Sequence, residues 1–385
     1  MRAVTWQGRE SVRVDDVDDA RVLERTDAVV RVSASGLCGS DLHLYRHLIP
    51  GLDRGDVLGH EAVGVVEAAG ADVAEVRPGD RVVIPFNVAC GRCPMCRRGL
   101  QSQCETTQNT RFHRGGSLFG YTEQYGDVPG CQAELVRVPF ADANLWPIPA
   151  DADPTVAVLL ADVLPTAWQG VAYADPEPGS TVAVFGLGPI GQAVARIALR
   201  RGVARVLGLD LVDERLAMAA RHGVEALDVR TLDDVPGALV ETTEGRGPDA
   251  VVDCVGMEAE GSALDSILQA TRVQPSRAIA LRHAIDAVRR GGTLSIVGVY
   301  AGPVQAFPLD QLFDKQVQVR MGQANVRRWL PDVAPLALDP ADPLGLRDIV
   351  THTPPLEGAP DAYEMFQAKR DGAVKVVFDL RPEAA

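Results

Sequence analysis

The sequence contains few residues of several kinds, and each shortage excludes a class of protein. Aromatic residues make up only 5% of its 385 residues, and cysteines number only 7. An odd cysteine count is poorly suited to a secreted scaffold in which oxidised cysteines pair. Residues 1–16 also lack the apolar run of a signal peptide. Both observations favour a cytoplasmic protein.

Positive charge is scarce as well. Asp and Glu number 52 against 38 Lys and Arg, which gives a formal net charge of −14. Phosphate backbones and anionic lipid repel such a chain, so we expect neither a nucleic-acid partner nor a membrane partner. Only Lys315, Lys369 and Lys375 are lysines, and we interpret this shortage as a composition bias without chemical content.

Long apolar runs are missing except at residues 156–174. That run is about as long as a membrane span, but it contains Asp162, Pro165 and Gln169. A charge is costly in the middle of a membrane. We therefore predict a buried helix, in which the Asp162 carboxylate requires a partner.

The pattern along the chain predicts two kinds of domain, as its length also suggests. Up to about residue 150, short alternating apolar runs are broken by Gly and Pro, which is typical of an antiparallel β domain. After that point strand and helix patterns alternate, which indicates a doubly wound parallel sheet. The expected fold class is therefore α/β, with a mostly antiparallel β domain and a Rossmann domain.

A glycine-rich turn follows the apolar strand pattern of residues 181–185. It reads Gly186-Leu-Gly188-Pro189-Ile190-Gly191 and opens a helix pattern. Glycines there permit a tight turn and a close approach of the backbone to a pyrophosphate at the helix N-terminus. The motif predicts a dinucleotide site, although the same glycines also occur in turns that bind nothing.

Asp210 ends the next strand pattern, nineteen residues after Gly191. An acidic side chain there accepts hydrogen bonds from the adenosine ribose and repels a 2′-phosphate, which favours NAD over NADP. Arg215 is a candidate ribose contact, and a solvated helix charge is the alternative.

Four cysteines fall within fifteen residues, in the order Cys90, Cys93, Cys96 and Cys104. Four thiolates complete tetrahedral zinc and leave no open position, so the spacing predicts a structural zinc site. An iron–sulfur centre is the first alternative, although the usual Cys-Pro is missing. A zinc ribbon that contacts nucleic acid is the second, encouraged by Arg92, Arg97 and Arg98 but opposed by the net charge.

Cys38, His60 and Asp162 form a second, dispersed set of candidate ligands. Three protein ligands leave a fourth zinc position for water or substrate, as a catalytic site requires. A divalent cation would also remove the cost of the carboxylate in its apolar run.

Four motifs occur in the order found in the zinc-dependent medium-chain alcohol dehydrogenases, and the chain resembles that family over essentially its whole length. They are GLCGSDLH (36–43), GHEAVG (59–64), the four-cysteine loop (90–104) and GLGPIG (186–191). Within the family the chain is most similar to the glutathione-independent formaldehyde dehydrogenases. The stretches that carry this similarity are PFNVACGRC (85–93), CQAELVRVPFADANL (131–145) and LADVLPT (160–166).

The resemblance implies a GroES-like catalytic domain formed by residues 1–160 and 306–385. A Rossmann NAD-binding domain, residues 161–305, is expected between them. Two zinc ions and one NAD per chain are implied. The reaction implied is oxidation of an alcohol or hydrated aldehyde, formaldehyde-like or short-chain, with hydride transfer to NAD.

The resemblance also assigns roles to single residues. It gives the catalytic zinc to Cys38, His60 and Asp162, whereas liver-type enzymes have a cysteine as third ligand and an arginine where Gly39 stands here. Ser40 and His43 match proton-relay positions, and their alternatives are a turn hydrogen bond and a surface residue. The remaining matches are carboxylates beside the ligands and a nicotinamide contact: Asp41, Glu61 and Thr166.

Residues 258–278 lie in a long connection. The resemblance to the formaldehyde dehydrogenases implies that this segment covers the adenine end of NAD and slows its release. Retained NAD permits dismutation of an aldehyde. Residues 299–320 are a candidate edge strand for a homodimer or homotetramer. Polyol or amino-alcohol oxidation is the alternative within the family. A non-catalytic nucleotide-binding protein is the alternative outside it.

Overall fold

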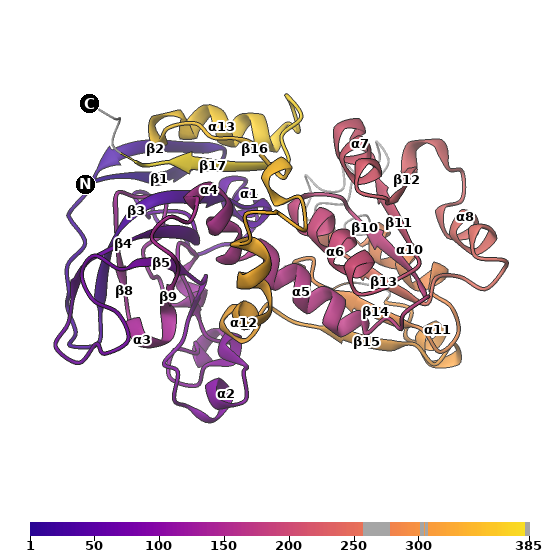
Figure 1. Ribbon diagram of the computed structural model, residues 1–385, viewed down its shortest axis with the longest axis horizontal. Coiled ribbons are helices and arrows are strands. Elements are labelled where there is room, and N and C mark those ends of the chain that lie inside the picture. Colours follow the sequence, from indigo (N-terminus) through magenta and orange to yellow (C-terminus); the bar gives the residue numbers. More distant parts are fainter. Residues whose placement is uncertain (257–277, 301–303, 305–306, 382–385) are drawn as a thin grey trace. The chain divides into compact units, whose positions relative to one another are not determined.

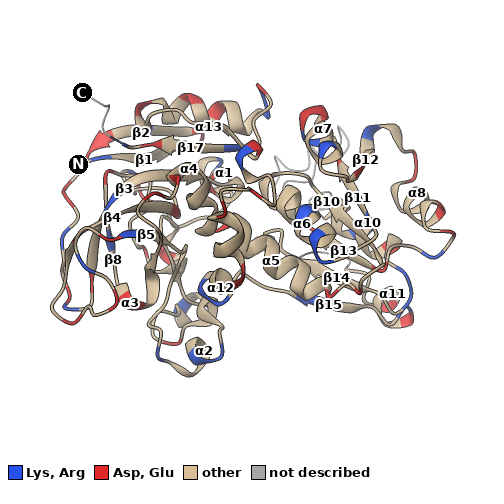
Figure 2. Cartoon of the chain, viewed as in Figure 1, with Lys and Arg blue, Asp and Glu red and all other residues tan. Residues whose placement is uncertain are grey.

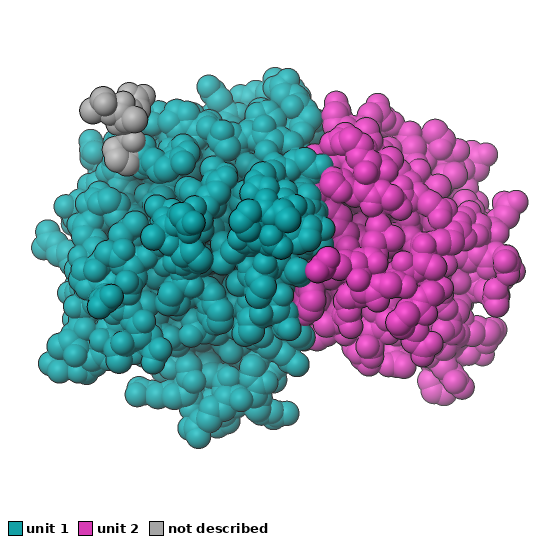
Figure 3. Space-filling model, in the orientation of Figure 1, with its two compact units in different colours: residues 1–165, 324–385 teal, residues 166–323 magenta. Residues whose placement is uncertain are grey.

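The structure, a computed structural model, describes residues 1–256, 278–300, 304 and 307–381. The chain divides into two compact units, residues 1–165 with 324–385 (unit 1) and residues 166–323 (unit 2) (Figure 3). The sequence placed these boundaries after residues 160 and 305. The later second boundary arises because a further strand, near residue 320, joins the sheet of unit 2.

Unit 1 is built on a mostly antiparallel sheet, as expected from its alternating runs (Figure 1). Its strands are β3 (Ala28–Leu37), β4 (Glu61–Ala69), β5 (Arg81–Ile84), β8 (Leu135–Val138), β9 (Trp146–Pro147), β16 (Val350–His352) and β17 (Lys375–Asp379). They lie in the order β16-β17-β3-β4-β5-β9, and β8 also pairs with β3. Two short pairs complete the strands of this unit: β1 (Arg2–Gly8) with β2 (Ser11–Asp16), and β6 (Asn87–Val88) with β7 (Ser117–Leu118).

The end of the chain returns to this sheet. Strand β17 pairs antiparallel with β3, so that Val376 lies opposite Leu37 and Asp379 opposite Ala34. The helices of unit 1 are α1 (Gly39–Tyr45), α2 (Pro94–Arg97), α3 (Ala141–Asn144), α4 (Pro154–Ala157), α12 (Val326–Ala337) and α13 (Ala359–Gln367). The return places residues from the C-terminal strand and helix against the turn that begins at Cys38.

The apolar run at 156–174 is helical and buried, as predicted. It forms the end of α4, a 3₁₀ turn at Val158–Leu160 and α5 (Val163–Ala174), which crosses the unit boundary. The stretch Pro154–Ala174 is apolar enough to span a membrane, but 83% of its most apolar window is buried inside the structure. Asp162 lies in the break between the 3₁₀ turn and α5.

Unit 2 contains a parallel six-stranded sheet in the order β12-β11-β10-β13-β14-β15. The strands are β10 (Thr181–Phe185), β11 (Arg205–Asp210), β12 (Glu225–Asp228), β13 (Ala250–Asp253), β14 (Thr293–Ile296) and β15 (Gln318–Met321). The helices described between them are α6 (Pro189–Arg200), α7 (Asp213–Arg221), α8 (Val235–Thr242), α10 (Ile279–Ala287) and α11 (Leu309–Asp314). The strand order reverses between β10 and β13, and dinucleotides bind at the carboxyl edge of such a sheet. The predicted α/β fold is confirmed.

The segment 258–278, expected to cover NAD, lies outside the described residues except for Ala278. Within the candidate edge-strand segment 299–320, the structure describes residues 299–300, 304 and 307–320. The last of these residues belong to β15, which is an edge of the sheet.

We expect Gly64→Ala to destabilise unit 1 by about 1–3 kcal/mol, the usual cost of overpacking a well-packed site. A Cβ at Gly64 would overlap the carbonyl oxygen of Arg31 and force β3 and β4 apart. Urea unfolding of the zinc-loaded protein measures the effect. Gly39→Ala is the control, because a Cβ at that position meets no atom within 4 Å. Equal midpoints for the two variants would contradict the close strand approach.

Candidate functional site

Three separate segments of unit 1 bring Cys38, His60 and Asp162 together. Cys38 follows β3 and caps the N-terminus of α1, His60 directly precedes β4, and Asp162 lies in the break before α5. The Asp162 Oδ2 atom lies 3.5 Å from Cys38 Sγ and 3.6 Å from His60 Nε2. With Glu61, each residue offers a ligand atom within 4.8 Å of the others. The structure therefore groups all three candidate ligands at one point.

The Asp41 carboxylate orients the His60 ring. His60 Nδ1 lies 3.0 Å from Asp41 Oδ1, which leaves Nε2 facing Asp162. Asp41 is itself held by the Cys38 backbone N–H, which donates to Oδ2 at 2.9 Å. Burial alone lowers the pKa of His60, but Asp41 and Asp162 outweigh it and raise that pKa. A histidine held in this way presents one ring nitrogen to a metal.

A buried ion pair lies directly behind the cluster. Lys375 Nζ donates to Glu61 Oε1 at 2.6 Å and to the Leu37 carbonyl oxygen at 3.1 Å, and neither side chain of the pair is exposed to solvent. Burial alone lowers the pKa of Lys375, but the Glu61 carboxylate outweighs it and raises that pKa. Our interpretation of the lysine shortage as chemically empty is therefore wrong for Lys375, which is the counter-ion of Glu61.

The cluster fits a single divalent zinc. Tetrahedral ligands at zinc distances of about 2.0–2.3 Å lie about 3.3–3.8 Å apart, close to the two separations that Asp162 makes. Burial, followed by the Asp162 charge, raises the pKa of Cys38. A cation would offset that negative charge, and the sulfur, nitrogen and oxygen donors are all types that zinc accepts.

Ser40 and His43 both lie on α1, beside the cluster. Ser40 is half-buried, and its Oγ lies 3.4 Å from His60 Nε2. His43 is 4% exposed, which excludes the alternative of a surface residue. Residues three apart on a helix share a face, so the pair can form a path away from the cluster.

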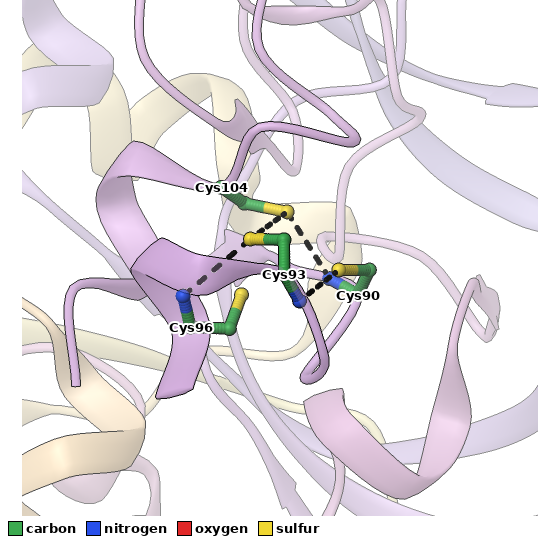
Figure 4. Close-up of side chains that lie close together, drawn as sticks. All are labelled: Cys90, Cys93, Cys96 and Cys104. Atoms are coloured by element: carbon green, nitrogen blue, oxygen red, sulfur yellow. Dashed lines mark hydrogen bonds between the residues drawn. The ribbon is translucent and has the colours of Figure 1, made fainter. Parts of the chain in front are cut away.

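The four cysteines of residues 90–104 form a second buried cluster (Figure 4). Backbone N–H groups point at three of the sulfurs: Cys93 N donates to Cys90 Sγ, Cys96 N to Cys93 Sγ, and Cys90 N to Cys104 Sγ, at 3.3–3.4 Å. Burial opposes ionisation, but hydrogen bonds from Thr106 and the backbone outweigh it and lower the pKa of Cys90. Such bonds favour the thiolate forms that bind metal.

The geometry of this cluster fits one ion. The four sulfurs lie within 4.8 Å of one another, and those of Cys93 and Cys104 are 4.0 Å apart. Four sulfurs on one zinc lie about 3.8 Å apart, whereas an iron–sulfur cluster holds them farther apart. Basic residues occur in α2 and α12 (Figure 2). Of the arginines that suggested a zinc ribbon, Arg97 donates to the Arg92 carbonyl oxygen within the loop.

The glycine-rich turn in unit 2 has the backbone that its sequence predicts. Gly186 has a φ of +84°, which favours glycine, and Gly188 caps α6 with Pro189 as the first helical residue. A Cβ at Gly191 would overlap the Gly186 carbonyl oxygen, so the helix packs directly on the turn. The N-terminus of α6 therefore stands at the carboxyl edge of β10, where a pyrophosphate can bind.

Asp210 secures the same turn. Its Oδ2 accepts from the Leu187 N–H at 2.7 Å, and its Oδ1 accepts from two N–H groups of the β11–α7 connection. Arg215 Nη1 lies 3.8 Å from Asp210 Oδ2, and the arginine side chain is only 15% exposed. That burial argues against a solvated helix charge. Thr166, at the start of unit 2, is also buried.

Further side chains surround His60, and sequence reasoning missed three of them: Phe86, Gln132 and Tyr363. Phe86 and Tyr121 place their rings edge-on to His60, at centroid distances of 6.0 and 6.4 Å. Gln132 and Tyr363 are fully buried and hydrogen-bonded to each other at 2.8 Å. Gln132 follows Cys131, a core residue, and its only signal was a polar side chain inside an apolar stretch.

Two family models match the chain. The alcohol dehydrogenase GroES-like domain matches residues 24–150, and the zinc-binding dehydrogenase domain matches residues 189–279. A zinc-type alcohol dehydrogenase-like protein of Bacillus subtilis is 38% identical, with 99% of this chain and all of that protein aligned. A glutathione-independent formaldehyde dehydrogenase of the same organism is 34% identical over 78% of this chain and 75% of its own.

A solved structure shows the same fold. An alcohol dehydrogenase from Thermus sp. ATN1 superposes with a TM-score of 0.84 and is 38% identical, and the match covers 99% of this chain and all of that one. The two family models and these relatives confirm the expected family.

We expect Asp162→Ala to bind one zinc per chain where the unaltered protein binds two. The substitution removes one of three ligands from the first cluster and leaves the four sulfurs untouched. Metal analysis after gel filtration measures the count. The control is Asp153→Ala, which removes the cap of α4, nine residues earlier, but no ligand. Two zinc ions in the Asp162 variant would place the third ligand elsewhere.

Proposed function

The chain belongs to the zinc-dependent medium-chain alcohol dehydrogenase family, and on that premise we propose that it oxidises an alcohol or hydrated aldehyde, formaldehyde-like or short-chain, with NAD as the hydride acceptor. The observation that carries the proposal is the meeting of Cys38, His60 and Asp162 at one buried point, with His60 turned by Asp41. Zinc held by these residues would supply a Lewis acid that lowers the pKa of a substrate hydroxyl, and NAD would supply the hydride acceptor.

The side chains around the cluster have separate tasks in this proposal. Ser40 takes the proton of the substrate hydroxyl and passes it toward His43. This path is supported by the position of both residues on one face of α1. Asp41 keeps the His60 ring in place, and Lys375 compensates the charge of Glu61. Because His43, His60 and Asp41 are buried, water competes little with a bound substrate.

The rings of Phe86 and Tyr121 support a small substrate. Both stand edge-on to His60, and Tyr121 is 9% exposed. The two rings add bulk beside His60, and the Phe86 ring offers no hydrogen-bond partner for the additional hydroxyls of a polyol. Similarity to a protein named glutathione-independent formaldehyde dehydrogenase supports formaldehyde hydrate as one substrate, whose oxidation yields formate.

Unit 2 supplies the cofactor residues of the proposal. The pyrophosphate is assigned to Gly186, Gly188 and Gly191 with the N-terminus of α6, and the adenosine ribose to Asp210 and Arg215. Thr166 is assigned to the nicotinamide. Tight retention of NAD, with dismutation as its consequence, is supported by the length of the connection after Gly256.

We also propose a homodimer or homotetramer in the cytoplasm. Strand β15 is an unpaired edge of the sheet in the described chain, and Met321 on it is 58% exposed. Phe313 on α11 is 86% exposed. Exposed apolar side chains beside an open strand edge favour association with a second copy.

A substrate panel tests the activity. We expect the zinc-loaded protein to produce NADH from formaldehyde or short alcohols, and to turn over formaldehyde without added NAD because the cofactor is retained. Absorbance of NADH measures the first result, and native mass spectrometry detects retained nucleotide. Activity with polyols alone would favour the polyol alternative. A zinc-loaded protein without turnover of any panel member would favour the non-catalytic alternative.

We expect Asp210→Asn to reduce the preference for NAD over NADP by about 10-fold or more, the value of a hydrogen bond to a charged group. The variant removes the charge that repels a 2′-phosphate. The ratio of kcat/KM for the two cofactors measures the effect. Asp213→Asn is the control, because Asp213 is an exposed carboxylate three residues away. An unchanged ratio in the Asp210 variant would remove this residue from cofactor selection.

A further inference from the structure

A line of buried polar side chains connects α13 with His60. The Tyr363 hydroxyl donates to Gln132 Oε1 at 2.8 Å, and Gln132 Nε2 donates to Asp41 Oδ2 at 3.4 Å. Asp41 Oδ1 then lies 3.0 Å from His60 Nδ1. Tyr363, Gln132 and Asp41 are all 0% exposed. The line therefore reaches the candidate zinc site from a helix near the end of the chain, without contact with solvent.

The hydrogen bonds along this line all run from Tyr363 toward Asp41, as the donors and acceptors of each group show. Burial raises the pKa of Tyr363, so its hydroxyl keeps its proton and donates it. Because the Gln132 oxygen faces that hydroxyl, the amide N–H groups face Asp41 and the Gly36 carbonyl oxygen, 3.1 Å away. Asp41 Oδ1 lies 3.0 Å from His60 Nδ1, where a carboxylate oxygen can accept a hydrogen bond from the ring N–H. His60 Nε2 is then the ring nitrogen that faces Asp162 and the candidate metal position.

Packing holds the two outer members in place. A Cβ at Gly59 would overlap the Gln132 side chain, so the amide lies directly on the backbone that precedes His60. The Tyr363 ring lies 5.4 Å from the ring of Tyr45, at the end of α1. Asp41 lies in the first turn of the same helix. Tyr363 thus contacts both the amide and the helix that position the Asp41 carboxylate.

We propose that Tyr363 is a positioning residue for the Cys38–His60–Asp162 site, which acts through Gln132 and Asp41 to hold His60 Nε2 toward the metal. This inference rests on the proposed zinc site. It predicts that the hydroxyl of Tyr363 contributes to zinc affinity although it touches neither zinc nor substrate. Outer partners of metal-bound histidines typically contribute about 10–100-fold in metal affinity.

Tyr363→Phe tests the inference, because it removes the hydroxyl and keeps the ring. We expect zinc at the Cys38 site to leave about 10-fold faster to a chromogenic chelator, the lower end of that range. The release phase of this site is identified as the one absent from Asp162→Ala. We also expect an altered visible spectrum when cobalt replaces zinc at the site, because the His60 ring is held less firmly.

Two controls separate positioning from general loosening. Tyr45→Phe removes a hydroxyl from the neighbouring ring and leaves Gln132 untouched, so zinc release should match that of the unaltered protein. The four-cysteine site is the internal control, and its release phase should not change in Tyr363→Phe. Equal acceleration of both phases, or unchanged release and cobalt spectrum, would overturn the inference.

A second variant serves if Tyr363→Phe does not fold. Gln132→Met keeps the volume of the side chain and removes both amide groups, so it should accelerate zinc release at least as much. Where both variants fold, combining them should add little, because they interrupt one line. Additive effects would overturn the inference. A single release phase in the unaltered protein, in contrast, would refute the proposed zinc site itself.

Discussion

The structure of unit 1 is governed by the need to compensate negative charge buried around one point. Asp41 and Glu61 have no exposed surface, and Asp162 is 6% exposed. Isolated carboxylates are costly in such an environment. Each is met by a specific partner: Asp41 by His60 and the Cys38 N–H, Glu61 by Lys375, and Asp162 by its contacts with the other two candidate ligands. A divalent cation between the ligands, as proposed above, would complete this compensation.

This requirement explains why the chain must return to its first domain. Lys375 begins β17, and that strand pairs with β3, whose end carries Cys38. The same return brings α13 and its Tyr363 against the turn that holds Asp41. Unit 2 also contains a buried carboxylate, that of Asp210, which hydrogen bonds compensate. The Asp210 carboxylate is compensated by backbone N–H groups, and this holds the turn at the N-terminus of α6 in shape.

Features coded by neighbouring residues could be predicted from the sequence. The glycine turn and the four-cysteine loop each depend on spacing within fifteen residues, and both have the expected local geometry. Strand β12 was missed because its sequence, EALD, is short and without an apolar alternation, and it is held by parallel pairing with β11. Helix α12 was missed because two prolines interrupt its pattern, at Pro331 and Pro335.

Residue type and spacing were sufficient to establish the family, the fold class and the candidate ligands. Donor atoms and hydrophobic periodicity depend on residues that lie close together in the sequence. Partners that lie far apart in the chain required the folded structure. Lys375 looked like a rare base inside a valine-rich strand, and 314 residues separate it from Glu61. Tyr363 carries no local signal either, and Gln132 carries only that of a polar side chain inside an apolar stretch. Their roles arise from a long-range antiparallel pairing and a close approach at Gly59, which no local pattern encodes.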